Sequence, residues 1–258
     1  MKYIEKVILL SEETSFRSYL QAELSKKYEI HTFGVKDISK EGLSNLTSAL
    51  ALIQPSCIIN ALPLSFYEKH QEYGPCIQRS LIGTESFYLE VKPFNFTKNA
   101  IRTVFKPYSA LVHSAFIEIG LMHSFRTNNL ITNFLERVKG KRKLTLKDES
   151  SVPLISERMA AKYLQLFLSK ASLNFNLIRN YQLCENGFPR LSDVFQQALS
   201  TASKINPSDY KAQLFFHSNS KPSFPSFDNS SFQMDAEVIL GDWKDGVIET
   251  ASGWVSEH

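Results

Sequence analysis

Three short segments in the first part of the chain have the pattern of buried strands. Residues 7–10 read Val-Ile-Leu-Leu and residues 57–62 read Cys-Ile-Ile-Asn-Ala-Leu, which are nearly continuous apolar runs. Such runs are typical of strands that are buried on both faces of a parallel sheet. Residues 28–33 alternate between apolar and polar positions and are rich in strand-forming side chains, so we expect another strand there.

Amphipathic stretches separate these segments. Residues 15–27 repeat large apolar side chains at spacings of four, which predicts a helix with one buried face. A second helix is expected from Ile38 to about residue 54, with Ser39 as its N-cap and Pro55 just after its end. Strands that alternate with helices indicate an α/β fold, in which right-handed crossovers build a doubly wound parallel sheet.

The rest of the chain continues this alternation less regularly. Residues 81–88 fit either a strand or a helix, and residues 206–232, which are rich in Ser, Pro, Phe and Asn, predict an irregular loop. Further strands are expected at residues 110–117, 144–146 and 174–180, and further helices at residues 96–104, 127–138, 155–168 and 191–202.

The composition excludes several classes of protein. The chain has 258 residues, a net charge of +3 and similar numbers of acidic and basic side chains, so we expect no nucleic-acid partner. No apolar segment approaches the ~18 residues of a membrane helix, and the first apolar run is too short for a secretion signal. Three scattered cysteines and histidines without ligand spacing predict neither disulfides nor a metal site. A cytoplasmic protein with reduced thiols is therefore expected.

The segment after the first strand has the position of a phosphate-binding loop. In nucleotide-binding α/β domains, a glycine-rich turn joins the first strand to the first helix, and the phosphates sit at the helix N-terminus. Here Ser11, Thr14 and Arg17 hold the three glycine positions, with Glu12 and Glu13 between the first two. Each glutamate repels a diphosphate by on the order of 1 kcal/mol or more at a few ångströms. The sequence therefore predicts weak or absent dinucleotide binding.

Two other roles are open to these side chains. The hydroxyl groups of Ser11 and Thr14, together with the guanidinium of Arg17, offer another route to binding a phosphate. Alternatively, the carboxylates of Glu12 and Glu13 cap a helix N-terminus that carries no ligand, which stabilises the unliganded fold.

Six short motifs occur in a characteristic order along the chain. They are residues 36–39, 55–62, 129–135, 151–160, 227–232 and 242–247. In this order they resemble the motifs of the dTDP-4-dehydrorhamnose reductase family, which belongs to the extended short-chain dehydrogenase/reductases. The resemblance implies a Rossmann-like domain at residues 1–120, and a smaller, partly interleaved α/β lobe for substrate or partner at residues 121–258. It also implies NADP or NAD as cofactor and a nucleotide-sugar as substrate.

The resemblance assigns a set of residues to the cofactor site. The family's counterpart of residues 36–39 lies beside the adenine, and the end of its third strand packs along the cofactor. With the phosphate-loop positions, the corresponding residues are Ser11, Thr14, Phe16, Arg17, Asp37, Ile38, Ala61 and Leu62.

The family's reduction requires a Tyr-x-x-x-Lys pair on one helical turn. The tyrosine donates a proton, and the lysine lowers its pKa. Residues 94–98 match this position best, with Phe94 in place of the tyrosine and Lys98 retained. A phenyl ring has no proton to give, so direct donation is lost. A literal motif exists at Tyr88 and Lys92, although the proline that follows would break a helix there; Tyr88 is therefore the alternative.

Residues 83–85, Gly-Thr-Glu, allow two interpretations. They resemble the end of the family's catalytic strand, which would make Thr84 the hydroxyl that polarises the substrate carbonyl. They also resemble a helix motif of the wider superfamily, which would make Thr84 structural. The chain between Asn60 and Ala110 is too short to hold both full elements.

The phosphate loop and the position of the catalytic tyrosine both differ from the family's pattern, while the order of elements persists. The leading hypothesis is a degenerate nucleotide-sugar reductase-like protein, a pseudoenzyme without cofactor or redox catalysis. It would bind a ligand or a partner protein through the inherited cleft, or pair with a second copy as a homodimer. The alternative is an active NAD(P)-dependent reductase or another enzyme that modifies a nucleotide-sugar.

Overall fold

The computed structural model describes residues 4–63, 66, 73–93, 113–147, 151–171, 179–217 and 227–258. The chain divides into two compact units, between which it passes several times. Unit 1 comprises residues 1–119, 161–182 and 229–238, and unit 2 comprises residues 120–160, 183–228 and 239–258. The sequence predicted a boundary at residue 120, with a nucleotide-binding domain before it and a lobe for substrate or partner after it. These two binding roles stay predictions.

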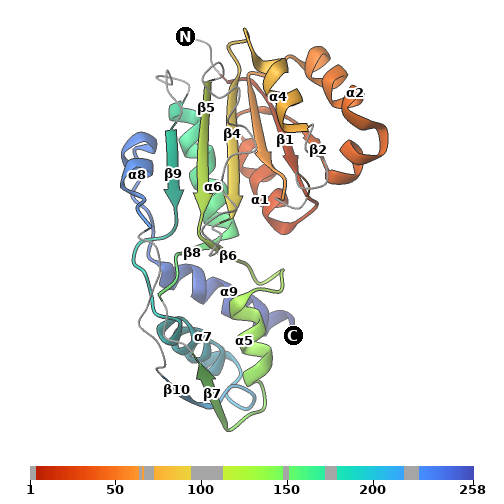
Figure 1. The fold of residues 1–258 in the computed structure, drawn as a ribbon. Helices are drawn as coiled ribbons and strands as arrows, with labels where there is room; N and C mark the ends of the chain where they lie inside the picture. Colours follow the sequence, from red (N-terminus) through yellow and green to blue (C-terminus); the bar gives the residue numbers. More distant parts are fainter. Residues whose placement is uncertain are drawn as a thin grey trace. The chain divides into compact units, whose positions relative to one another are not determined.

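Unit 1 is built on a six-stranded sheet in the order β2-β1-β3-β4-β5-β9 (Figure 1). The strands are β1 (Lys6–Ser11), β2 (Glu29–Phe33), β3 (Cys57–Ala61), β4 (Phe87–Pro93), β5 (His113–Ile119) and β9 (Arg179–Leu183). The neighbouring pairs among β1 to β5 are parallel. This sheet confirms the doubly wound, Rossmann-like fold that the alternating pattern predicted.

Helices cover the sheet because each presents one apolar face to it. In unit 1 they are α1 (Ser15–Leu24), α2 (Val35–Ile53), α4 (Tyr73–Leu81), most of α6 (Glu157–Ala171) and α8 (Ser230–Ala236). Ile8 and Ile58 from the sheet form one buried cluster with Leu46 and Leu50 of α2 and Ile77 of α4. Burying each such side chain stabilises the fold by about 1.5–3 kcal/mol.

Helix α2 begins earlier than the sequence predicted. Gly34 is its N-cap, and the backbone N–H of Gly34 donates to Asp37 Oδ2 at 2.8 Å. The prediction of Ser39 as N-cap was wrong, because the helix already begins at Val35 and the bond between Gly34 and Asp37 closes its first turn. The predicted end of the helix is confirmed, since Gln54 caps it in the left-handed region with φ 49°.

The end of the predicted loop at residues 206–232 belongs to regular structure, so that prediction was wrong in part. Helix α8 packs onto unit 1 through Phe232, whose ring stacks on Phe167 of α6 with centroids 5.3 Å apart. Tyr181 of β9 completes the cluster, and its hydroxyl donates to Asp235 Oδ2 at 2.6 Å. Aromatic burial therefore holds this late segment on unit 1.

Unit 2 has two small parallel sheets and three larger helices. One sheet pairs β6 (Leu121–His123) with β8 (Leu154–Ser156), and the other pairs β7 (Lys143–Lys147) with β10 (Gln213–His217). The strand β10 is a second element that the sequence assigned to a loop. The helices are α5 (Leu130–Val138), α7 (Leu191–Ile205) and α9 (Trp243–Glu257).

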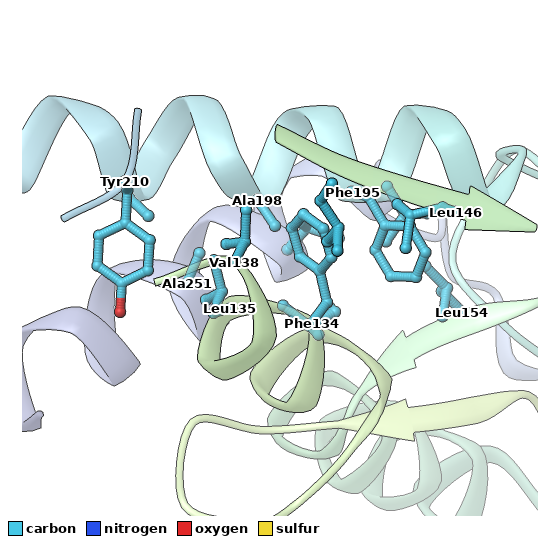
Figure 2. Packing of buried hydrophobic residues seen from close by; sticks show 14 of the residues in the cluster. Phe134, Leu135, Val138, Leu146, Leu154, Phe195, Ala198, Tyr210 and Ala251 are labelled. Carbon is cyan, nitrogen blue, oxygen red and sulfur yellow. The ribbon is translucent and has the colours of Figure 1, made fainter. Parts of the chain in front are cut away.

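The core of unit 2 lies where α5, α7 and α9 meet. Figure 2 shows Phe134 and Leu135 from α5 facing Phe195 and Ala198 from α7, with Ala251 from α9 in the same cluster. The rings of Phe134 and Phe195 stack with centroids 4.4 Å apart. Because three helices contribute to one cluster, unit 2 has a hydrophobic core of its own.

Candidate functional site

The carboxyl ends of β1 and β3 lie side by side in unit 1. Leu10 pairs with Asn60, and Ser11 pairs with Ala61. The chain leaves β1 toward β2 on one side and later reaches β3 on the other, which makes this a topological switch point. Ligands of open α/β sheets bind outside the strand ends at such a point. The structure therefore brings two predicted cofactor residues, Ser11 and Ala61, to the expected edge.

The turn after β1 is closed by its own polar groups. Thr14 is the N-cap of α1, and its hydroxyl accepts the backbone N–H of Arg17 at 3.3 Å. The N–H of Thr14 donates to the carbonyl of Glu12 at 3.0 Å. Glu12, Glu13 and Thr14 are exposed. One of the helix amides that a phosphate would use is thus already satisfied, and two acidic side chains flank the turn.

Arg17 folds back onto the residue that follows β2. A Cβ built at Gly34 would lie 3.2 Å from Arg17 Nη1, 3.4 Å from Asp37 Oδ2 and 3.8 Å from the carbonyl oxygen of Ser11. Gly34 therefore makes room for the guanidinium of Arg17, the residue that holds the third glycine position of the loop. Sequence reasoning missed Gly34; its signal was a glycine directly after a predicted strand, where a close approach is common.

Two polar atoms at this edge are buried without a hydrogen-bond partner in the part of the chain that the structure describes. They are Ser11 Oγ and Arg17 Nη1. Phe16 is buried on the inner face of α1. The Thr14 cap and the flanking glutamates distinguish this turn from a glycine-rich phosphate loop, whereas Ser11 Oγ and Arg17 Nη1 are hydrogen-bond donors of the kind that bind an anion.

The remaining predicted cofactor residues have mixed positions. Asp37 lies beside Arg17 and Gly34, as described above. Leu62 is buried in the cluster under α2 and α4, and its N–H donates to Asn60 Oδ1 at 3.3 Å. The side chain of Ile38 is outside the described part of the chain.

A cluster of polar side chains lies on one face of β4. Tyr88, Glu90 and Lys92 alternate along the strand, so all three side chains leave it on the same side. The hydroxyl of Tyr88 donates to Glu90 Oε2 at 3.3 Å, and Lys92 Nζ lies 2.5 Å from Glu90 Oε1. Asn60 Nδ2 donates to the Tyr88 hydroxyl at 2.6 Å. Four polar groups from two adjacent strands are therefore linked in one buried chain.

Burial dominates the electrostatics of this group. Glu90 is only 3% exposed, and desolvation raises the pKa of its carboxyl, while the ammonium of Lys92 and the hydroxyl of Tyr88 act in the opposite direction. The sequence analysis did not single out Glu90 or Asn60. Their signal was a polar residue that interrupts each of two otherwise apolar strands.

The literal Tyr-x-x-x-Lys motif therefore lies on a strand and not on a helix. Four residues along a strand separate the two Cα atoms by about 13 Å, whereas one helical turn would bring them close. Tyr88 and Lys92 meet through Glu90 instead. Phe94 and Lys98, the other predicted catalytic pair, lie outside the described residues.

Thr84 occupies the turn between α4 and β4. Gly83 ends the helix with φ +77°, and the Thr84 hydroxyl donates to the carbonyl of Leu81 at 2.8 Å. The interpretation of residues 83–85 as a strand end is wrong, because β4 begins only at Phe87. Thr84 thus precedes the amino end of β4, and it lines a groove of about 790 Å³ beside Gln54 and Ser56. It does not share an edge with Ser11 and Ala61.

No family model and no curated protein matches the sequence. Solved structures do match. A GDP-L-fucose synthetase from Naegleria fowleri bound to NADP aligns over 100% of this chain and 94% of its own, with a TM-score of 0.74 and 11% identity. A dTDP-4-dehydrorhamnose reductase from Bacillus anthracis in complex with NADP aligns over 97% and 98%, with a TM-score of 0.72 and 12% identity. A UDP-N-acetylglucosamine 4-epimerase from Bacillus cereus aligns over 96% and 99%, with a TM-score of 0.68 and 11% identity.

These comparisons confirm the resemblance at the level of the fold. The chain has the fold of the extended short-chain dehydrogenase/reductases, including that of dTDP-4-dehydrorhamnose reductase. At such low identities the likeness shows the fold alone, and chemistry has to be argued from the site.

No helix among the described residues is long and apolar enough to cross a membrane. No group of three or more His, Cys, Asp or Glu side chains in the same ranges is arranged to hold a metal ion. The thiols of Cys57 and Cys184 are buried, and burial raises the pKa of both.

Proposed function

We propose that this protein keeps the fold of a nucleotide-sugar reductase without its redox chemistry. It binds a ligand or a partner protein at the carboxyl edge of the unit 1 sheet. The observation that carries this proposal is the closed turn after β1. Thr14 caps the helix amide of Arg17, Arg17 fills the space beside Gly34, and Glu12 adds negative charge where a diphosphate would lie. The Phe94 substitution supports it, since it removes the proton donor.

An active enzyme is the second candidate, and a specific observation favours it. The chain of Asn60, Tyr88, Glu90 and Lys92 places a buried carboxyl with a raised pKa and an ammonium near the carboxyl end of β4. Perturbed groups of this kind are common at active sites. Two of the structural neighbours are bound to NADP, which gives a nicotinamide cofactor as the one to test.

Thermal denaturation with added NADPH or NADH separates the two candidates. A cofactor present at about 100 times its dissociation constant stabilises a protein by about 2.7 kcal/mol. We expect no shift for the natural sequence. A matched variant, Ser11→Gly/Thr14→Gly/Arg17→Gly, restores the glycine positions and should gain a shift. A clear shift of the natural protein with either cofactor would overturn the proposal.

The ligand and partner parts of the proposal need separate measurements. Titration with dTDP-glucose and UDP-glucose in the absence of cofactor tests a nucleotide-sugar ligand. Sedimentation equilibrium tests a homodimer, and recovery of a second protein from the native host tests a partner. If the protein sediments as a monomer, is recovered alone and ignores both sugars, the binding role is refuted even where redox catalysis is absent.

A further inference from the structure

A histidine and a glutamate lie deep inside unit 2, next to a glycine of the C-terminal helix. His123 ends β6 and is 1% exposed, and Glu185 follows β9 and is 2% exposed. A Cβ built at Gly246 of α9 would lie 2.9 Å from Glu185 Oε2 and 3.0 Å from His123 Cε1. The helix backbone therefore packs closely against both side chains, and a larger residue at position 246 would force one of them or the helix to shift.

His123 and Glu185 each have one polar atom in a hydrogen bond and one polar atom without a partner among the described residues. His123 Nδ1 shares a hydrogen bond of 2.8 Å with the hydroxyl of Thr250, which lies one turn after Gly246 on α9. The carboxyl of Glu185 accepts the backbone N–H of Ser156. His123 Nε2 and Glu185 Oε2 have no partner in the portion of the chain that the structure describes. Burying unpartnered atoms is tolerable only while both groups are uncharged.

Three acidic groups near Glu185 disfavour its ionised form. Asp245 and Glu249 on α9, and Asp242 at the N-cap of that helix, act on it electrostatically. Glu249 is partly compensated by Arg158 at 3.2 Å, but the pair is exposed and contributes little. The neighbouring thiol of Cys184 is buried and neutral. Loss of the carboxyl proton would therefore place a negative charge against an acidic helix start, opposed only in part by the backbone N–H of Ser156.

We propose that Glu185, His123 and Gly246 form a proton-operated latch, which holds the start of α9 in place while the pair is uncharged and releases it when Glu185 ionises. The latch acts on a large part of unit 2, because Trp243, Val247 and Ala251 of α9 belong to its core. Desolvation raises the pKa of Glu185 to about 8 and lowers that of His123 to about 3, so both groups are uncharged in the neutral range.

The two tryptophans of the chain make the latch observable, because both lie on α9. Trp254 stacks on His258 and interacts with Tyr210, so a Trp254→Phe background leaves Trp243 as the only reporter. In this background we expect the tryptophan emission to change reversibly as the pH rises through about 8, where Glu185 ionises. The far-ultraviolet circular dichroism should show that the sheet of unit 1 stays folded.

Matched variants decide whether Glu185 causes the change. Glu185→Gln should abolish the transition, and Glu257→Gln, the same change at an exposed position of α9, should keep it. Gly246→Ala should shift the emission at every pH, because its methyl group displaces the helix, although alanine otherwise favours a helix over glycine. The proposal is overturned if Glu185→Gln retains the transition, if Glu257→Gln removes it, or if Gly246→Ala leaves the emission unchanged.

Discussion

Glu90 in unit 1 and Glu185 in unit 2 are both nearly fully buried, yet their surroundings are opposite. Glu90 has a lysine at 2.5 Å and a tyrosine hydroxyl within hydrogen-bond distance. Glu185 faces an uncharged histidine and three acidic groups. Burial raises the pKa of both carboxyls, but only Glu90 has a cation that stabilises its ionised form. Glu90 therefore serves as one half of an ion pair in unit 1, whereas Glu185 in unit 2 is, in the proposed latch, a group that is protonated while the latch is closed.

Breaking the ion pair between Glu90 and Lys92 in unit 1 should have the largest effect on the free energy of unfolding. Lys92→Met leaves the Glu90 carboxyl buried without its cation, and removal of one partner of a buried pair costs about 3–5 kcal/mol. Urea unfolding at neutral pH measures this loss. The double variant Glu90→Gln/Lys92→Met should recover most of it, because no unpaired charge remains. A loss below about 1 kcal/mol for the single variant would show that the pair is well solvated.

The second prediction is a bell-shaped dependence of unit 2 stability on pH. Because the pKa of Glu185 is raised from 4.5 to about 8, its contribution is present at low pH and is lost as the pH rises through this range. Because the pKa of His123 is lowered from 6.5 to about 3, its contribution is present above 6.5 and is lost on acidification.

The two contributions oppose each other between pH 4.5 and 6.5, so the maximum of stability should lie there. Each limb spans about 1.5 pH units and is therefore worth on the order of 2 kcal/mol. Chemical denaturation followed by tryptophan fluorescence across the pH range measures the profile. Glu185→Gln should remove the alkaline limb and extend the acid limb up to about pH 6.5, where the pKa of free histidine lies. An unchanged alkaline limb would contradict the assignment.

A helix cap in unit 2 provides a third, smaller effect. Asn129 Oδ1 accepts the backbone N–H groups of Ile131 and Thr132, and the hydroxyl of Thr132 accepts the N–H of Asn129. Asn129→Ala removes half of this reciprocal cap and should cost about 1 kcal/mol. Denaturation midpoints compare it with Asn128→Ala, an exposed neighbour outside the cap. Equal midpoints for the two variants would count against the cap.

The smallest effect tests the acidic surroundings of Glu185. Glu249→Gln breaks an exposed ion pair with Arg158, which should cost less than about 1 kcal/mol. It also removes a negative charge that raises the pKa of Glu185. The alkaline limb of unit 2 stability should therefore move to lower pH, which the same fluorescence titration detects. Movement to higher pH would reverse the sign of the electrostatic argument.

Local patterns in the sequence were enough for the architecture. The apolar runs at residues 7–10 and 57–62 predicted buried parallel strands, and the structure contains β1 and β3 there. The repeat of large side chains at residues 15–27 predicted α1. These predictions succeeded because strand and helix periodicity is set by neighbours a few residues apart. The family resemblance, and not periodicity, assigned both Ser11 and Ala61 to the cofactor site, and the structure pairs them at one edge of the sheet.

Positions that depend on distant neighbours were decided only by the tertiary structure. The sequence allowed Thr84 to lie at a strand end or in a helix, and the structure places it in the turn after α4, which ends at Leu81. Arg17 lies against Gly34, and Glu185 meets His123 and Gly246, although each set is far apart along the chain. By itself, the sequence determined the alternation of strands and helices in the first part of the chain, but it did not reveal β10 or α8. Tertiary packing decided which polar groups are buried together, because burial and charge act through space and leave no periodic signal in the sequence.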